Sequence, residues 1–255
     1  MQRQSYMNRN LFRIFLILAV SMVFFGSTDF VARAGGEQPP HNGADPNYVP
    51  TAQELQAIAA KEAAAARYMK NRSLLIVPLS LGSRVLGVGT WLEPNDAAHV
   101  NYCGPGATQV ALDARLPASS VPNIDTLGTE ESIDITWGVT TTSIRNVLNS
   151  RLSTTFYVAS GASASTALHT RIVTDIDSNY AMVTGVKTGG MPGWGTRNVF
   201  HIVAVYGYNE VNVGLMNIYY IETASPTAGF TGTYRNTKTL STFWTYVSQN
   251  NSQVW

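Results

Sequence analysis

The order of the periodic segments constrains the fold of this 255-residue chain more than any other feature. Helical spacing is found mainly in the first part, whereas short runs rich in β-branched and aromatic residues follow residue 155. Helices are expected over residues 51–70, 107–115 and 140–152. Strands or extended segments are expected over 74–78, 84–88, 156–158, 180–184, 201–206 and 216–221. Helices followed by strands predict an α+β domain with an antiparallel sheet.

The first 34 residues have the layout of a secretory signal peptide. Basic residues precede an apolar run over residues 14–25, and Val31-Ala-Arg-Ala34 has the small-x-small pattern of a cleavage site. The apolar run is shorter than the roughly 20 residues that a membrane span requires. We therefore expect an exported protein, either secreted or held at the cell surface. The alternative is an uncleaved anchor, in which case only this segment contacts the membrane.

Residues 35–72 are expected to connect the signal peptide to the main domain at 73–255. Gly, Pro and Asn are frequent over 35–50, which predicts a flexible linker. Thr51 and Glu54 then have the spacing of a capping box before an Ala-rich helix. This helix is interpreted as a spacer, with a pro-segment and a surface helix packed on the domain as alternatives.

Composition excludes several classes of function. The formal net charge is +1 and only 13% of residues are charged, so no basic face for nucleic acid is expected. With one Cys, the chain forms no intrachain disulfide and no multi-cysteine zinc site, and we predict neither a metal nor a cofactor. An unpaired Cys outside the cell is open to oxidation, so its presence indicates intermolecular pairing, burial or chemistry.

Cys103 is the candidate nucleophile. Gly104-Pro-Gly106 and an expected helix follow it, and Pro is tolerated in the first turn of a helix. The N-terminus of a helix favours an anion, which eases formation of the reactive thiolate. A backbone N–H at the same helix end, with Gly104 as the candidate, can hold an oxyanion. The alternative interpretation is a buried, unreactive Cys.

A nucleophilic Cys needs a base, and His201 is the candidate because it opens an apolar strand just after a Gly-rich loop. The other histidines of the chain are His41, His99 and His169. Glu222 ends the next expected strand, so an antiparallel neighbour can aim its carboxylate at His201. Fallback orienting residues are Asn212 and Asn217. A structural His and a solvated carboxylate are the alternatives.

Three segments, taken in order, resemble the peptidase C39-like family of the papain-like cysteine peptidase superfamily. Residues 102–109 (YCGPGATQ) resemble the active-site segment YCGPAxxQ. Residues 191–195 (MPGWG) with 201–208 (HIVAVYGY) are similar to the LPGWGG…HxVxVYGY segment of exported bacterial members. Residues 220–225 (YIETAS) resemble the YYxDxAS stretch. The resemblance extends over about residues 76–230.

The resemblance implies a papain-like fold, in which a helical part carries the Cys and a sheet part carries the His. It also implies thiol-dependent hydrolysis of peptide or protein amides through an acyl-enzyme. Carried over by position, Cys103 is the nucleophile, His201 the base, and Glu222 stands at the family's Asp or Asn position.

Two departures from the family pattern affect the site. Glu222 is one methylene longer than Asp, and Ala97 stands where the family has the Gln that completes the oxyanion hole. Loss of one oxyanion donor typically costs about two to three orders of magnitude in rate. The candidate oxyanion or substrate-binding residues are Asn95, Asn101, Gly104 and Trp194, with His99 as a further substitute for the Gln.

Three functions therefore remain open. The first is a secreted cysteine peptidase or related amide hydrolase. The second is a catalytically weak or inactive cell-surface binding module, which Ala97 and several tryptophans favour. The third is an acyl transferase on the same Cys–His pair, because only the acceptor that resolves the acyl-enzyme differs. The chain has no GxxxxGK[ST] motif, so the ATP-driven peptide export of some family members is not expected.

Overall fold

The computed structural model describes residues 42–75, 82–212 and 215–255, which all belong to one compact unit. The predicted signal peptide, the part of the expected linker over 35–41 and part of the expected strand over 74–78 lie outside the described residues. In the part of the chain that is described, no helix combines the length and apolarity needed to cross a membrane.

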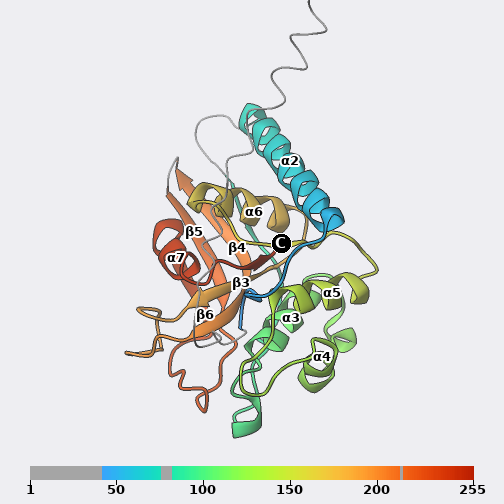
Figure 1. The fold of residues 1–255 in the computed structure, drawn as a ribbon. Helices are drawn as coiled ribbons and strands as arrows, with labels where there is room; N and C mark the ends of the chain where they lie inside the picture. Colours follow the sequence, from blue (N-terminus) through green and yellow to red (C-terminus); the bar gives the residue numbers. More distant parts are fainter. Residues whose placement is uncertain (1–41, 76–81, 213–214) are drawn as a thin grey trace, which may run out of the picture. The chain divides into compact units, whose positions relative to one another are not determined.

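Helices dominate the first half of the described chain, and strands the second (Figure 1). The helices are α2 (Ala52–Leu75), α3 (Cys103–Asp113), α4 (Ile124–Glu130), α5 (Thr141–Arg151), α6 (Ser165–Asp177) and α7 (Leu240–Val247). The strands are β1 (Ser83–Val85), β2 (Ala159–Ser160), β3 (Met182–Lys187), β4 (Phe200–Asn212), β5 (Leu215–Ile221), β6 (Arg235–Thr239) and β7 (Gln253–Val254).

These strands form one sheet in the order β2-β7-β3-β4-β5-β6, and β1 pairs with β4 off this path. Every pairing between the named strands is antiparallel. The predicted α+β class with N-terminal helices and a mostly antiparallel sheet is therefore confirmed. The long strand β4 carries His201 and pairs with β3, β5 and β1, so His201 lies on a central strand of the sheet.

The three expected helices are present, with corrected ends. The segment over 74–78 was expected to be extended, but Leu74 and Leu75 complete α2. The helix expected to start beside Cys103, with Pro105 in its first turn, begins at Cys103 and ends at Asp113, two residues before the expected end. Helix α6 was not expected, although Leu168, Ile172 and Ile176 recur at helical spacing on its buried side. Its Ser- and Ala-rich start, without a capping side chain, gives little local signal.

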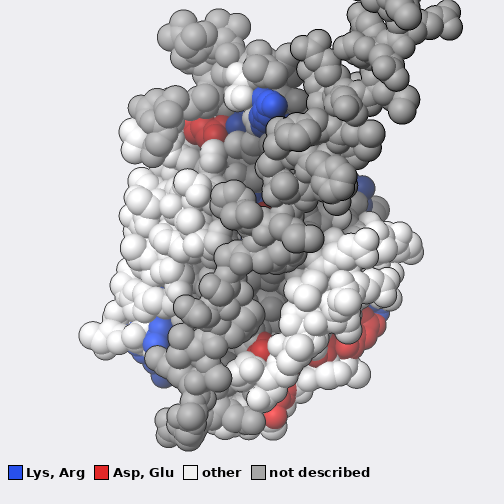
Figure 2. Space-filling model, turned by 45° about the horizontal axis from the view of Figure 1, so that its top comes forward, with Lys and Arg blue, Asp and Glu red and all other residues white. Residues whose placement is uncertain are grey.

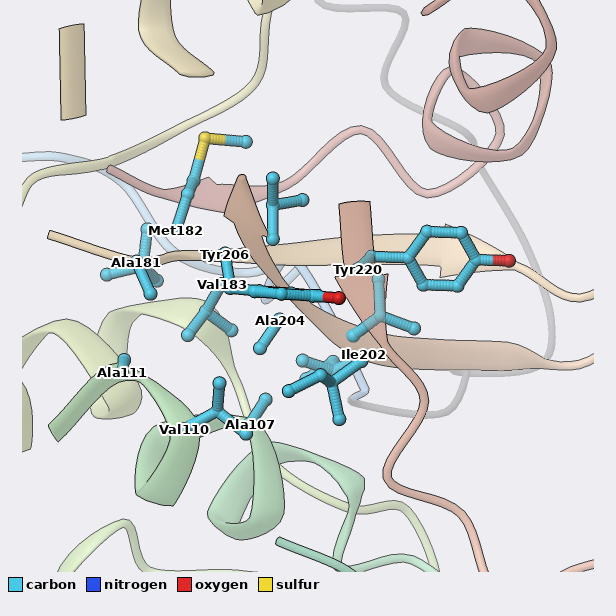
Figure 3. Close-up of a cluster of buried hydrophobic side chains, with 14 of the residues drawn as sticks. Ala107, Val110, Ala111, Ala181, Met182, Val183, Ile202, Ala204, Tyr206 and Tyr220 are labelled. Atoms are coloured by element: carbon cyan, nitrogen blue, oxygen red, sulfur yellow. The ribbon is translucent and has the colours of Figure 1, made fainter. Parts of the chain in front are cut away.

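Helix α3 packs directly on the centre of the sheet (Figure 3). Ala107, Val110 and Ala111 lie on one face of the helix at spacing i, i+3, i+4 and point towards β3 and β4. They meet the buried side chains of Val183 and Ala204. The two small alanines permit a close approach, which fixes the start of α3 against the strand that carries His201.

Helix α2 is attached to α6 and β4 largely through charged and polar groups. Lys61 Nζ lies 3.2 Å from an oxygen of Asp175 on α6, and the Tyr68 hydroxyl donates to Asp177 at 2.7 Å. Its N-terminus has the predicted capping box: Thr51 N donates to Glu54 Oε2 at 2.8 Å, and Glu54 N to Thr51 Oγ1 at 3.2 Å. Few of its apolar side chains are buried, which follows from its Ala-rich sequence.

The charged side chains are sparse on the described surface. On the face drawn in Figure 2, blue and red atoms form small separate groups among uncharged ones. This pattern agrees with a composition in which 13% of residues are charged.

Candidate active site

Cys103 is the first residue of α3, and Tyr102 is its N-cap. The helix is initiated by the bond from Gly106 N to Tyr102 O, at 2.9 Å. Pro105 is the third helical residue, where an N–H has no intrahelical partner, so the ring costs no hydrogen bond. The thiol therefore lies at a helix N-terminus, where the unpaired N–H groups and the dipole favour a negative charge.

His201 and Glu222 are brought together by the register of β4 and β5. Ala204 pairs with Ile221, so Glu222, the next residue, lies diagonally across the strand pair from His201. His201 Nε2 and Glu222 Oε1 form a hydrogen bond and an ion pair in the interior, where both residues are no more than 3% exposed. The extra methylene of Glu222 does not prevent the contact.

Glu222 is itself held from two further directions. Trp194 Nε1 donates to Oε2 at 2.9 Å, and Ala224 N donates to Oε1 at 3.0 Å. The Trp194 ring also lies against His201, with 4.9 Å between ring centroids. Trp194, predicted as a substrate-binding candidate, therefore contacts both members of the His–Glu pair, and it also lines the adjacent pocket.

The Cys103 thiol and the His201 imidazole interact electrostatically, and each shifts the pKa of the other. Because Nε2 of His201 is bonded to Glu222, Nδ1 is the ring nitrogen left for the thiol. Charge therefore couples the thiol to the imidazole, and a hydrogen bond joins the imidazole to the carboxylate. This is the arrangement that an activated nucleophile requires: a base beside the thiol and a third group that orients the base.

Burial and charge act in opposite directions on the three titratable groups. Burial alone lowers the pKa of His201, but the charges of Glu222 and then Cys103 outweigh it, and the pKa is raised well above its ordinary value. Burial alone raises the pKa of Glu222, but His201 outweighs it, so this pKa is lowered. At neutral pH the pair is therefore imidazolium and carboxylate. Burial raises the pKa of Cys103, and the neighbouring imidazolium opposes that rise.

The other predicted oxyanion candidates have different positions. Asn101 Nδ2 donates to the carbonyl groups of Ile135 and Thr136, at 2.8 and 3.1 Å. Asn95 is exposed, and its Oδ1 accepts from Thr227 N at 2.9 Å. The structure therefore does not bring Asn95 to the Cys–His–Glu cluster, and the amide of Asn101 is engaged with a loop.

Ala97, His99 and Gly104 complete the set that the sequence singled out. Ala97 is exposed at the start of a short 3-10 helix, Ala97–His99. Both ring nitrogens of His99 are bonded to carboxylates away from the cluster, those of Asp96 and Asp125. Gly104 is buried beside Cys103, and a Cβ at this position would overlap Cγ1 of Val139.

Glu93 belongs to the site but was not predicted. It is 4% exposed, its Oε2 accepts from Ser225 N at 3.0 Å, and its backbone N donates to Thr223 O at 2.8 Å. Burial raises the pKa of Glu93 to about 7, and the charge of His201 opposes this rise. Ionised Glu93 in turn raises the pKa of Cys103. The only sequence signal was an acidic residue in a weakly charged chain.

A pocket of about 370 Å³ opens beside the cluster. Its lining includes Asn42, Glu93, Asn101, Trp194, Arg197 and His201. Cys103 is only 1% exposed, so the thiol lies beneath this surface and not on it.

The described residues contain no group of three or more His, Cys, Asp and Glu side chains placed to hold a metal ion. Comparison of the whole chain with protein-family models and with curated proteins found no match in either case.

Proposed function

We propose that this protein is a papain-like cysteine peptidase or a related amide hydrolase, with Cys103 as nucleophile, His201 as base and Glu222 as orienting residue. The observation that carries the proposal is the buried hydrogen bond between His201 and Glu222, together with the electrostatic coupling of His201 to the buried Cys103 at the start of α3. The helix that carries the thiol packs on the sheet that carries the imidazole, as the papain-like fold implies. The ordered motifs of the C39-like family support the same assignment.

The proposed reaction has two stages. In the reactive form the proton of the thiol already lies on His201 Nδ1, so that a thiolate stands beside an imidazolium, and this thiolate attacks the carbonyl carbon of an amide to give a tetrahedral oxyanion. The C–N bond breaks as His201 returns the proton to the leaving amine, and a thioester remains on Cys103. Water then gives a proton to His201 and attacks the thioester, and collapse releases the carboxylic acid and the free thiol.

The surroundings of Cys103 act on its pKa in opposite directions: burial raises it, whereas the charge of His201 lowers it. The raised pKa of His201 keeps a proton available for the leaving amine. The thiolate gains from the imidazolium and from the N-terminus of α3. Unpaired N–H groups in the first turn of α3 are the donors that we assign to the oxyanion.

We propose an extracytoplasmic peptide or protein as the substrate. This part rests on the signal-like residues 1–34, which lie outside the described residues, and on the resemblance to exported members of the family. The proposed reaction needs no metal or cofactor, since the thiol, the imidazole and water account for every bond made and broken.

The test is labelling with an electrophilic peptide ketone that forms a thioether only with an activated thiol. Because the chain has one Cys, the mass of the intact protein reports Cys103 alone. We expect labelling of the wild type and a loss of about two orders of magnitude or more in His201→Ala, since base catalysis typically contributes that much. Cys103→Ala is the blank. A wild type that stays unlabelled and hydrolyses no member of a peptide library would overturn the proposal.

Adding a primary amine to the same reaction separates hydrolysis from acyl transfer. We expect the free acid as the main product when water resolves the acyl-enzyme. An amide adduct as the main product would instead identify the acyl transferase alternative.

A further inference from the structure

The first described residues of the chain run between the helical part and the sheet. In Figure 1 this blue segment precedes α2 and passes beside α3 and β3. Gly43 forms a parallel bridge with Thr140, in which Gly43 N donates to Val139 O at 3.2 Å and Thr141 N donates to Gly43 O at 2.8 Å. Both backbone groups of Gly43 are therefore paired as in a β-strand.

Asn42 extends this pairing and attaches the segment to the sheet as well. Its Oδ1 accepts from Val139 N at 3.2 Å on the helical side. Its carbonyl oxygen accepts from Asn250 Nδ2 at 2.7 Å on the other side. The same Asn250 amide lies 3.3 Å from the carbonyl oxygen of His201. The segment is thus bonded to residues that touch both halves of the candidate active site.

These neighbours place the segment close to the nucleophile and the base. Val139 packs so tightly on Gly104, the residue after Cys103, that no Cβ fits there. Asn250 contacts the backbone of His201, and Asn42 shares the pocket lining with the His201 side chain. A chain that pairs with Val139 on one side and Asn250 on the other therefore crosses the site between its two halves.

We propose that residues 42–44 occupy a groove that binds extended peptide backbone, and we call these residues the tethered occupant. They cover Cys103 until another strand takes their place in the groove. The inference rests on the proposed function and adds its regulation. An incoming substrate strand finds the same partners: the carbonyl and N–H of Val139, the N–H of Thr141 and the amide of Asn250. Addition of a strand to exposed backbone groups is a common mode of peptide recognition.

The attachment of the segment is small enough to be reversed. Only Asn42 and Gly43 are buried, whereas residues 44–50 are exposed or half-buried, and Val49 is 82% exposed. Displacement therefore breaks a few hydrogen bonds and uncovers little apolar surface. Local opening of this kind is expected well below the free energy of global unfolding.

The first experiment replaces Gly43 by a residue whose side chain cannot be accommodated beside Asn250. The φ of Gly43 is +145°, and a Cβ would overlap the side-chain amide of Asn250, so Gly43→Val unseats the segment in the full chain. Gly87→Val is the matched control, because no atom lies within 4 Å of a Cβ at Gly87. We expect iodoacetamide to alkylate Cys103 about tenfold faster in Gly43→Val than in the wild type, with Gly87→Val unchanged. Equal rates in all three proteins would overturn the proposal.

The second experiment separates opening from general loosening of the fold. A synthetic peptide with the sequence of residues 42–50 is added to Gly43→Val, and alkylation is measured again. We expect this peptide to slow alkylation back towards the wild-type rate, and a peptide with Val at the position of Gly43 to have no effect. Fast alkylation that neither peptide changes would show that the variant is merely destabilised, and would count against the groove.

Alkylation by a small reagent reports access to the thiol and not catalysis, so the two proposals can fail separately. If the segment controls alkylation but no acyl-enzyme forms, the groove stands and the peptidase assignment fails. If the acyl-enzyme forms equally in the wild type and in Gly43→Val, with equal alkylation, the peptidase stands and the tethered occupant fails.

Discussion

Glu222 bonds His201 through one carboxylate oxygen and Trp194 through the other. The carboxylate is 1% exposed, so neither bond is weakened by competition with water. A neutral orienting amide has one acceptor and one donor end, and cannot accept from both partners at once. The site therefore depends on the charge of residue 222 and on both of its oxygens, which distinguishes it from a site oriented by an amide.

Glu222→Gln tests this dependence. In one orientation of the amide its NH₂ group faces the N–H of Trp194, and in the other orientation it faces His201, which then lacks an acceptor. In either case one buried hydrogen bond is lost, at a cost of about 1–3 kcal/mol. The pKa of His201 falls towards its ordinary value, because the charge that raises it is gone. We expect the probe-labelling rate to drop about 100-fold or more. Full activity in this variant would contradict the role assigned to Glu222.

The same pair predicts how stability depends on pH. The lowered pKa of Glu222 contributes stability above its unfolded pKa of about 4.3, and this is lost as pH falls through the folded value. The raised pKa of His201 contributes stability that is complete below about pH 6.5 and is lost as pH rises through the folded value. The difference in Tm between wild type and Glu222→Gln should be largest near about pH 5–6 and shrink at about pH 3 and pH 10.

Trp194→Phe separates the indole N–H from the ring. The variant keeps an aromatic ring against His201 but leaves Oε2 of Glu222 without its donor. Trp255→Phe is the matched control, because Trp255 is also fully buried and its Nε1 also donates, to Ser160 Oγ at 2.9 Å. We expect both variants to lose about 1–3 kcal/mol of stability. Only Trp194→Phe should shift the pH profile of labelling, and an unshifted profile would make Trp194 purely structural.

Local patterns in the sequence were sufficient to predict those parts of the fold that depend on interactions between residues close in the chain. The capping box at Thr51 and Glu54 and the apolar face of α5 are both short-range signals, and both elements formed as expected. The pairing of His201 with Glu222 also followed from sequence, because two consecutive strands joined by a tight connection lie side by side.

The remaining parts of the site depend on contacts between distant residues. Glu93 reaches the site through a bond to Ser225, 132 residues away, and Asn42 through a bond to Asn250, 208 residues away. No spacing rule connects such positions in a single sequence. The linker over 35–50 was predicted as flexible from its Gly and Pro content, and that composition carries no sign that Asn42 and Gly43 are buried between the two halves.

Glu93→Gln should make the thiol easier to ionise. The pKa of Glu93 is raised to about 7, so at pH 8 the wild type has a buried negative charge that raises the pKa of Cys103. Removal of that charge is expected to move the pH profile of Cys103 alkylation to lower pH. Asp175→Asn is the control, since it also neutralises a buried carboxyl with a raised pKa, about 6, but one that is paired with Lys61. Identical profiles for all three proteins would exclude Glu93 from the site.

The raised pKa of Glu93 also predicts the direction in which folding stability changes with pH. Its folded pKa lies above the unfolded value of about 4.3, so ionising it in the folded state costs free energy as pH rises from about 4.3 to about 7. The wild type should therefore lose stability over this range relative to Glu93→Gln. The measurement is chemical denaturation of both proteins at several pH values, and a constant difference would contradict the raised pKa.

Gly104→Ala tests how closely α3 must approach the loop before α5. The added Cβ overlaps Cγ1 of Val139, and both residues are buried, so Val139 or the start of α3 has to move. Overpacking of this kind typically costs about 1–3 kcal/mol. Because Cys103 is the adjacent residue, the shift also moves the thiol relative to His201, and labelling should slow together with the loss of stability. Gly87→Ala is the control, since a Cβ there meets no atom within 4 Å and should leave both stability and labelling unchanged. A Gly104→Ala protein with wild-type stability and a wild-type labelling rate would show that the start of α3 adjusts freely, and that the position of Cys103 is not fixed by Val139.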